Sequence, residues 1–176
     1  EKRGLPNRKS TVDSLPDLVS EKSLSLFSKY GVFTERELHS RYEIFLESYH
    51  KTINIESQLT LQIAQRSILP AALRYQAEVA GAVANLKSAG VTVPKTQTAH
   101  LNELVEAIDN LQSAIDQLSE AMDEPSKGDS LDHAKHSRDV VIPAILPVRG
   151  AGDTLETLVA DDLWPLPTYQ EMLFIK

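Results

Sequence analysis

The most regular pattern in the chain is a run of apolar side chains between residues 101 and 122. Successive members are separated by three, four, three, four, three and four residues, which is the spacing of a coiled-coil seam. Burying such side chains is worth roughly 1.5–3 kcal/mol each before conformational entropy is subtracted, so this face requires partner helices. We therefore predict a helix over residues 97–123 whose inner face forms a bundle core of Leu101, Leu104, Ile108, Leu111, Ile115, Leu118 and Met122.

A much longer helical pattern precedes this seam. Thr34 and Glu37 have the spacing of a capping box, and the apolar positions after them step by four, three and four residues along one face. These positions are Leu38, Tyr42, Phe45 and Tyr49. No stop signal follows until Gly90, so the element would run for about 55 residues, or about 80 Å at the usual helical rise. Because Pro70 removes a backbone hydrogen bond inside it, we expect a kink near residues 66–69.

Shorter segments precede the long helix. A short helix is predicted over residues 21–30, with Ser20 as its N-cap and Gly31 as its left-handed terminator. Residues 1–13 are basic and polar and are interpreted as a linker, and residues 14–20 as a single turn.

A third long helix is predicted over residues 131–160. Its middle is weakened by Pro143, Pro147, Gly150 and Gly152, which leaves its continuity through 143–152 open. Thr168 and Glu171 form another capping box, which indicates a final helical turn. The predicted fold class is all-α: an antiparallel helical bundle with one very long helix kinked near Pro70, two further long helices and short terminal helices.

The composition narrows the class of partner. The 176 residues carry 18 Lys and Arg against 25 Asp and Glu, a net charge of -7, which disfavours nucleic acid and anionic membranes as partners. No cysteine is present and no apolar run approaches the roughly 20 residues of a membrane span, so a cytoplasmic location is expected. The chain opens at Glu1 rather than at a methionine, and we expect it to be the end piece of a longer protein.

The sharpest metal signal is Glu47-x-x-His50, together with His39 and Glu43 at helical spacing. Di-iron bundles use two such pairs and two further inward carboxylates, but no second Glu-x-x-His is present and the later seam is aliphatic. We therefore interpret these residues as a solvated polar face. His133 and His136, with Asp132 nearby, could bind a stray metal ion. Acidic residues at the start of a helix are already expected from the helix dipole, so we prefer that interpretation.

No motif points to catalysis. The stretch RGAGD, residues 149–153, lacks a preceding strand and the lysine and hydroxyl of a phosphate-binding loop, so we interpret it as a weakened helical segment. The acidic pair Asp161 and Asp162 has no candidate partner base. No catalytic, cofactor-binding or metal-binding residue is assigned to this chain.

The only tryptophan, Trp164, precedes Pro-Leu-Pro near the end of the chain. An exposed Trp-Pro-Leu-Pro ribbon would suit a polyproline ligand of another protein. The alternative is an anchor that ties the chain end to a folded body, which is the more usual role of a terminal aromatic.

Four segments together resemble the C-terminal region of type III glutamine synthetase: EKRGLPNRKST, LVSEKSLSLFSKYGVFTERELHSRYEIFLESYHKTINIES, ILPAALRYQ and LETLVADDLWPLPTYQEMLFIK. The resemblance covers nearly the whole chain in the same order and is weakest over residues 95–150. It implies a parent enzyme that makes glutamine from glutamate and ammonia, using ATP and divalent Mg or Mn in a catalytic domain upstream of Glu1. It also implies homo-oligomers of stacked hexameric rings.

The resemblance sets the expected domain layout and docking surface. Residues 1–13 would be the linker or tail of the upstream catalytic domain, and residues 14–176 the C-terminal helical domain. The half of the long helix beyond Pro70 would join the two later helices, while the first half and the tail would form a base against the enzyme body. The expected docking residues are Leu38, Tyr42, Phe45, Tyr49, Trp164, Met172 and Phe174.

Three functions compete at this point. They are an accessory domain of a ligase, a free-standing helical adapter for other proteins, and a metal-binding bundle. A longer reading frame with ligase motifs would favour the first, a start codon adjacent to Glu1 the second, and bound metal the third.

Overall fold

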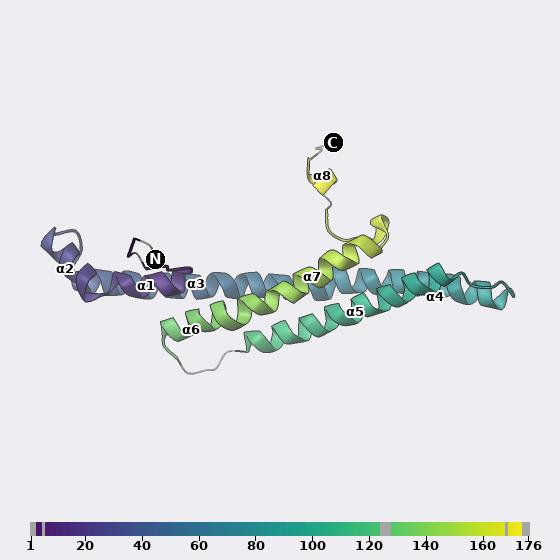
Figure 1. Ribbon diagram of the computed structural model, residues 1–176, viewed down its shortest axis with the longest axis horizontal. Helices are drawn as coiled ribbons and strands as arrows, with labels where there is room; N and C mark the ends of the chain where they lie inside the picture. The colour runs from purple at the N-terminus through teal and green to yellow at the C-terminus, as the bar shows by residue number, and fades with distance from the viewer. Residues whose placement is uncertain (1–2, 5, 124–127, 168, 174–176) are drawn as a thin grey trace. The chain divides into compact units, whose positions relative to one another are not determined.

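The structure is a computed structural model that describes residues 3–4, 6–123, 128–167 and 169–173 (Figure 1). It is 82% helical and has no strand among the described residues, which confirms the predicted all-α class. The helices in chain order are α1 Thr11–Leu18, α2 Glu21–Lys29, α3 Glu35–Ile63, α4 Leu69–Ser88, α5 Lys95–Met122, α6 Ser130–His136, α7 Ile142–Leu158 and α8 Tyr169–Leu173. Short segments of other helix types are η1 Ala64–Ile68, η2 Ser137–Val141 and η3 Asp161–Leu163.

Local capping signals were predicted correctly. Ser20 caps α2 by accepting from the Ser23 N–H, and the Thr34 N–H donates to Glu37 Oε2 at 2.7 Å while the Glu37 N–H donates to Thr34 Oγ1 at 3.3 Å. Gly31 and Gly90 have φ of 65° and 76° and end α2 and α4. After each glycine, the next N–H reaches back five residues to a helix carbonyl, as in a Schellman motif.

The long helix is continuous from Glu35 to Ser88, but its backbone widens before Pro70. There the Leu69 N–H donates to Ala64 O, five residues back, which makes η1 a π-helical turn. A proline ring would crowd the carbonyl four residues before it in an α-helix, and the wider turn relieves this contact. The disturbance predicted near residues 66–69 therefore takes the form of a π-turn.

The same device recurs before Pro143. The Ile142 N–H donates to Ser137 O, again five residues back, and η2 links α6 to α7 without a break. Pro147 lies inside α7, so the helix continues through the stretch whose continuity the sequence left open. Helical backbone thus extends from Ser130 to Leu158.

The chain forms two compact units, residues 1–56 with 122–143 and residues 57–121 with 144–176. In the first unit, α1 and α6 pack on α3 around buried Val12, Leu46 and Ala134. Partly buried side chains complete this core: Leu15, Tyr42, Tyr49 and Leu131.

Helix α1 begins earlier than the sequence suggested. Ser10 Oγ accepts from the Asp13 N–H at 3.1 Å and caps the helix at Thr11, inside the segment interpreted as a linker. The side chain of Val12 is only 2% exposed. Because this burial depends on a neighbour distant in sequence, the polar composition of residues 1–13 did not reveal it.

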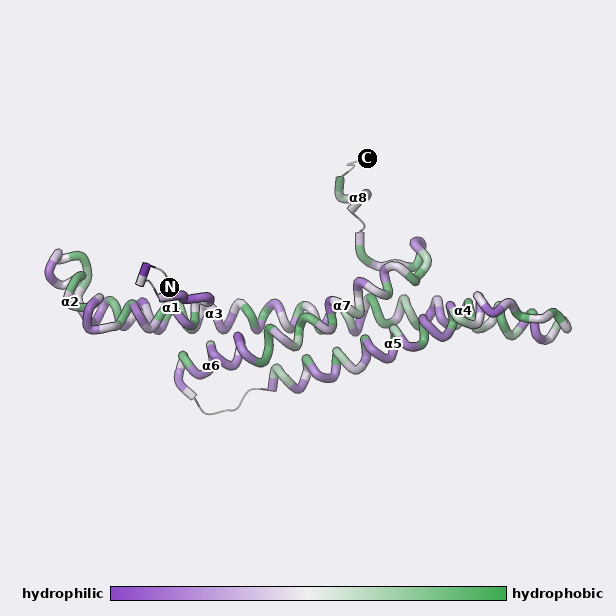
Figure 2. The backbone as a smooth tube through the Cα atoms, in the orientation of Figure 1, coloured by the Kyte–Doolittle hydropathy of each residue, from purple (hydrophilic) through white to green (hydrophobic). Residues whose placement is uncertain are grey.

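The second unit contains α4, most of α5 and α7. Helix α5 runs back beside α4, and Tyr75 Oη lies 3.4 Å from His100 Nε2 across the pair (Figure 1). Hydrophobic and hydrophilic positions alternate along α5 (Figure 2). Gly152 of α7 lies close to η1, where a Cβ at this glycine would stand 3.6 Å from Ile68 Cδ1.

The tail was expected to form a base together with the first half of the long helix, and its docking on an enzyme body stays a prediction. Segment η3, directly before Trp164, contacts α4, so the tail belongs to the unit that contains the half beyond Pro70. The first half of the long helix instead shares its unit with residues 122–143, which contain the start of the third long helix. Across the residues that the structure describes, every helix is too short or too polar to cross a membrane.

Candidate functional site

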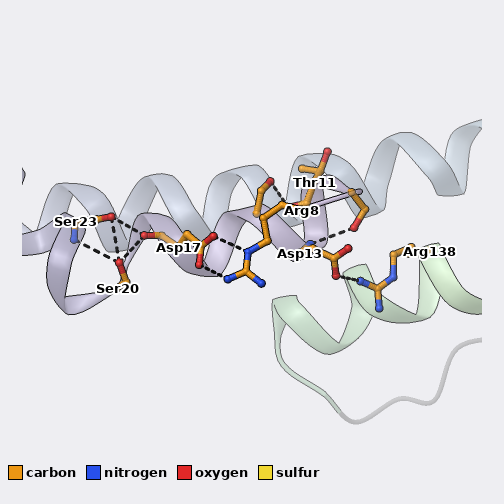
Figure 3. Close-up of polar contacts among 9 residues, drawn as sticks. Arg8, Thr11, Asp13, Asp17, Ser20, Ser23 and Arg138 are labelled. Carbon is orange, nitrogen blue, oxygen red and sulfur yellow. Dashed lines mark hydrogen bonds and ion pairs between the residues drawn. The ribbon is translucent and has the colours of Figure 1, made fainter. Parts of the chain in front are cut away.

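A network of charged side chains connects α1 to η2 in the first unit (Figure 3). Arg138 Nη1 donates to Asp13 Oδ1 at 2.6 Å, while its Nε and Nη2 donate to the two carboxylate oxygens of Asp139 at 2.6 and 2.7 Å. Hydrogen bonding to Asp139 raises the pKa of Arg138, and the same contact lowers the pKa of Asp139. Arg138 thus links η2 to α1 through a charge-assisted hydrogen bond to Asp13.

A second ion pair fixes the segment before α1. Arg8 Nε and Nη2 donate to the two oxygens of Asp17 at 2.7 and 2.8 Å, a bidentate pair (Figure 3). This bond lowers the pKa of Asp17 and raises that of Arg8. The carbonyl of Asp17 also accepts from the hydroxyls of Ser20 and Ser23 at 2.8 and 2.6 Å. The chain before α1 is therefore folded back along the helix and tied to its last turn.

An apolar groove lies between α1 and α3 in the first unit. Its volume is about 390 Å³. Phe45 is 46% exposed at the groove, and its neighbour Ile44 is 57% exposed. The residues that line it are Thr11, Leu15, Phe45, Ser48, Tyr49, Thr52 and Ile53.

The residues singled out for metal binding make other contacts. Glu47 Oε1 pairs with Lys51 Nζ at 2.6 Å, and this bond lowers the pKa of Glu47. His50 Nδ1 lies 2.9 Å from Ser137 Oγ, which donates to His133 O at 3.1 Å. Nowhere in the described parts of the chain do three or more His, Asp or Glu side chains gather where they could hold a metal ion.

The remaining candidates also lie in helical surroundings. His39 Nε2 lies 3.9 Å from Glu35 Oε1, and Glu43 is exposed. The Asp132 N–H donates to Asp129 Oδ1 as part of the cap of α6. Arg149 Nε donates to Asp153 Oδ1 at 2.6 Å within α7, so RGAGD is a turn of helix. His136 lies in the last turn of α6, and Asp161 and Asp162 are exposed in η3.

The residues expected to dock on an enzyme body differ in exposure. Leu38 is 0% exposed, and Tyr42 and Tyr49 are half-buried against the core of the first unit. Phe45 and Met172 are 46% and 56% exposed. Among the expected docking residues that the structure describes, only Phe45 and Met172 therefore present a large exposed surface; docking itself stays a prediction.

The tail residues complete this set. Trp164 is half-buried, and its Nε1 is covered by protein without a hydrogen-bond acceptor among the described residues. Such a ring is partly withdrawn from solvent, which favours the anchor interpretation over a free polyproline ligand. Thr168 and Phe174 lie outside the described residues.

Of the predicted bundle core, Leu104, Ile108, Leu111, Ile115 and Leu118 are buried, and Leu101 and Met122 are half-buried. The energetic role of this seam stays a prediction.

The sequence predicted neither the network nor the part of the groove wall formed by Thr11, Leu15 and Ile53, although Phe45 and Tyr49 were expected at a docking surface. The start of α1 carries a signal that could have been found, because Ser10 and Asp13 have the spacing of a capping box. The partnership of Asp13 with Arg138 has no such signal, since 125 residues separate them.

Comparison with known proteins adds a family relationship. The family model described as glutamine synthetase C-terminal domain matches residues 1–87. The chain is 34% identical over 181 residues to the type-3 glutamine synthetase of Dictyostelium discoideum, a match that covers 99% of this chain and 24% of that protein. The glutamine synthetases of Butyrivibrio fibrisolvens and Bacteroides fragilis are 30% and 29% identical, over 98% and 99% of this chain and 25% of each relative. The chain therefore spans about a quarter of the length of these relatives.

Proposed function

The chain belongs to the family of glutamine synthetase C-terminal domains, and from this premise we propose that it is the non-catalytic helical domain of an ATP-dependent ligase. The parent enzyme would form glutamine from glutamate and ammonia. The observation that carries the proposal is the match of 99% of this chain to only 24% of a type-3 glutamine synthetase.

The assignment of catalysis to another part of the parent rests on the chemistry of the described side chains. Glu47 is engaged by Lys51, and the described His, Asp and Glu residues form no cluster of three that fits a metal ion. ATP and the divalent Mg or Mn would be held by the upstream catalytic domain of the parent.

The role that we propose is structural support, assembly or regulation of the parent. Its partners would be the upstream catalytic domain and further copies of the same chain, arranged in stacked hexameric rings in the cytoplasm. Phe45 and Met172 are 46% and 56% exposed. They support docking because covering large apolar side chains removes apolar surface from water and so stabilises the association.

The test begins with the full reading frame, expressed with and without residues 1–176. Glutamine formation is assayed for the full-length chain, the truncated chain and the isolated segment, and their masses in solution are measured by light scattering. The expected result is an active full-length ligase, an inactive segment, and altered assembly or activity on truncation. A full-length chain that makes no glutamine refutes the parent activity, and an isolated segment that makes glutamine above a no-protein control refutes its non-catalytic role.

A further inference from the structure

We propose that the groove between α1 and α3 receives an apolar side chain from the part of the parent chain that precedes residue 1. This inference rests on the proposed function, because it requires an upstream domain. It adds a binding surface for that domain. Thr11, Leu15 and Ile53 belong to this surface, and the sequence did not indicate any of the three as a docking residue.

The groove is suited to an aromatic or aliphatic side chain. Its walls carry Leu15, Phe45 and Ile53, and the hydroxyl of Thr52 donates to Ser48 O at 2.9 Å. Because this hydroxyl is already bonded within α3, an apolar occupant does not deprive it of a partner. Covering the exposed part of Phe45 would add hydrophobic stabilisation.

The α1 wall of the groove is held in place before any occupant arrives. Ser10 caps the helix, Arg8 ties the preceding segment to Asp17, and Arg138 bonds Asp13 from η2. Val12, on the same helix, is 2% exposed in the core of the unit. Because α1 is already ordered, binding of an occupant costs little conformational entropy in this helix, which favours affinity.

The path of the chain identifies the occupant. Thr11, the first residue of α1, lines the groove, and the ten residues from Glu1 to Ser10 can span at most about 36 Å at 3.6 Å per residue. Whatever precedes residue 1 in the parent is thus tethered near the groove at high effective concentration. A second copy or an unrelated protein has no such tether, so the upstream part of the same chain has the advantage.

The experiment uses the full-length parent chain with Ser48→Cys carrying a photoactivatable cross-linker. Ser48 is exposed and lines the groove, and Ser40→Cys, exposed on the same helix away from the groove lining, is the matched control. Isotopically heavy and light chains are mixed before assembly so that mass spectrometry distinguishes links within a chain from links between copies. We expect links from position 48 to peptides that precede residue 1 of the same chain, several-fold more abundant than from position 40.

Three outcomes would overturn the proposal: links mainly between heavy and light chains, links mainly within residues 1–176, or no excess over the control. Ser48→Trp provides a second arm by filling the groove. It should remove hydrogen-exchange protection from the upstream peptide, whereas Ser40→Trp should not, and unchanged protection in Ser48→Trp contradicts the proposal. Glutamine formation by the unsubstituted chain reports on the proposed function separately, since an inactive parent with links from position 48 leaves the groove assignment intact.

Discussion

Arg138 Nη1 donates to Asp13 Oδ1 at 2.6 Å, although 125 residues separate the two side chains in the sequence. Arg138 stands in the π-turn η2 and Asp13 in the first turn of α1, and their side chains are 27% and 40% exposed. The bond therefore joins the first helix of the chain to a segment that follows α5.

Removing this ion pair should weaken the first unit in a salt-dependent way. Asp13→Asn and Arg138→Gln should each lower the unfolding midpoint, and the double variant should lose less than the sum of the two, because the pair is removed only once. Partial exposure to solvent keeps the effect small, and 1 M salt should shrink it further. Denaturant titrations of the four proteins test this, and strictly additive losses would show that the two side chains do not interact in solution.

Stability should fall at both acid and alkaline pH. Hydrogen bonds hold the pKa of Asp17, Glu37 and Asp139 below their ordinary values, so the unfolded chain binds protons first as the pH drops. This stabilisation is complete above the unfolded values of about 3.9 for Asp and 4.3 for Glu, and it is lost as the pH falls through the folded values.

The alkaline limit has the opposite cause. Burial raises the pKa of Tyr42 and Tyr49, so the unfolded chain loses these protons first above about pH 10 and stability falls as the pH rises. Unfolding midpoints from pH 2 to 11 provide the test. Asp17→Asn should flatten the acid limb and leave the alkaline limb unchanged; an unaltered acid limb would argue against the Arg8 bond.

The capping box of α3 should contribute measurably to stability. Thr34→Ala leaves the Glu37 N–H without its hydroxyl acceptor, and loss of such an N-cap typically costs about 0.5–2 kcal/mol. Thr52→Ala is the matched control, because Thr52 lies inside α3 and Ala has the higher helix propensity there. Equal free energies of unfolding for the two variants would mean that the box is not formed in solution.

The inner face of α5 should dominate the stability of the second unit. Leu111 is 0% exposed, and replacing a buried leucine by alanine costs about 2–5 kcal/mol. Val105→Ala on the same helix, at 44% exposure, should cost far less, within roughly 0.5 kcal/mol for a surface change. Thermal and denaturant unfolding measure both; a Leu111→Ala midpoint like wild type, together with a loss for exposed Glu106→Ala, would reverse the assigned face.

The tail should stabilise α4. Because η3 contacts α4 and precedes Trp164 directly, Trp164→Ala should increase hydrogen exchange over residues 69–88 and leave residues 36–50 protected. The buried Nε1 has no acceptor in the described chain, so Trp164→Phe, which removes this unsatisfied donor, should be tolerated better than Ala. If Trp164→Ala increases exchange more at residues 36–50 than at residues 69–88, the tail packs on the first unit and not on α4.

Much of the local structure was readable from the sequence alone. Ser20, Thr34 and Glu37 act on N–H groups within three residues, and Gly31 and Gly90 adopt the positive φ that few other residues tolerate. The heptad spacing of α5 predicted its helix within two residues at each end. These features depend on atoms close together along the chain, which explains why a linear pattern predicts them.

The π-turns were visible only in part. Pro70 and Pro143 marked where the helices would be disturbed, but a proline can end, kink or widen a helix. The structure has the third outcome at both places, with Leu69 and Ile142 bonded five residues back. Whether a proline ends, kinks or widens the helix depends on the packing of the neighbouring helical turns, because each turn must keep its buried residues facing the core.

Tertiary structure alone decided how the segments combine. The sequence determined that residues 10–13 can cap a helix, yet burial of Val12 and the bond from Arg138 to Asp13 required α6 and η2 to return to α1. It placed an acidic pair just before Trp164, yet it predicted neither the short turn η3 nor its contact with α4. Contacts between distant residues depend on the path of the whole backbone. The entropy cost of closing the loops and the gain from burying the core are properties of the entire unit, so neighbours in the sequence do not determine them.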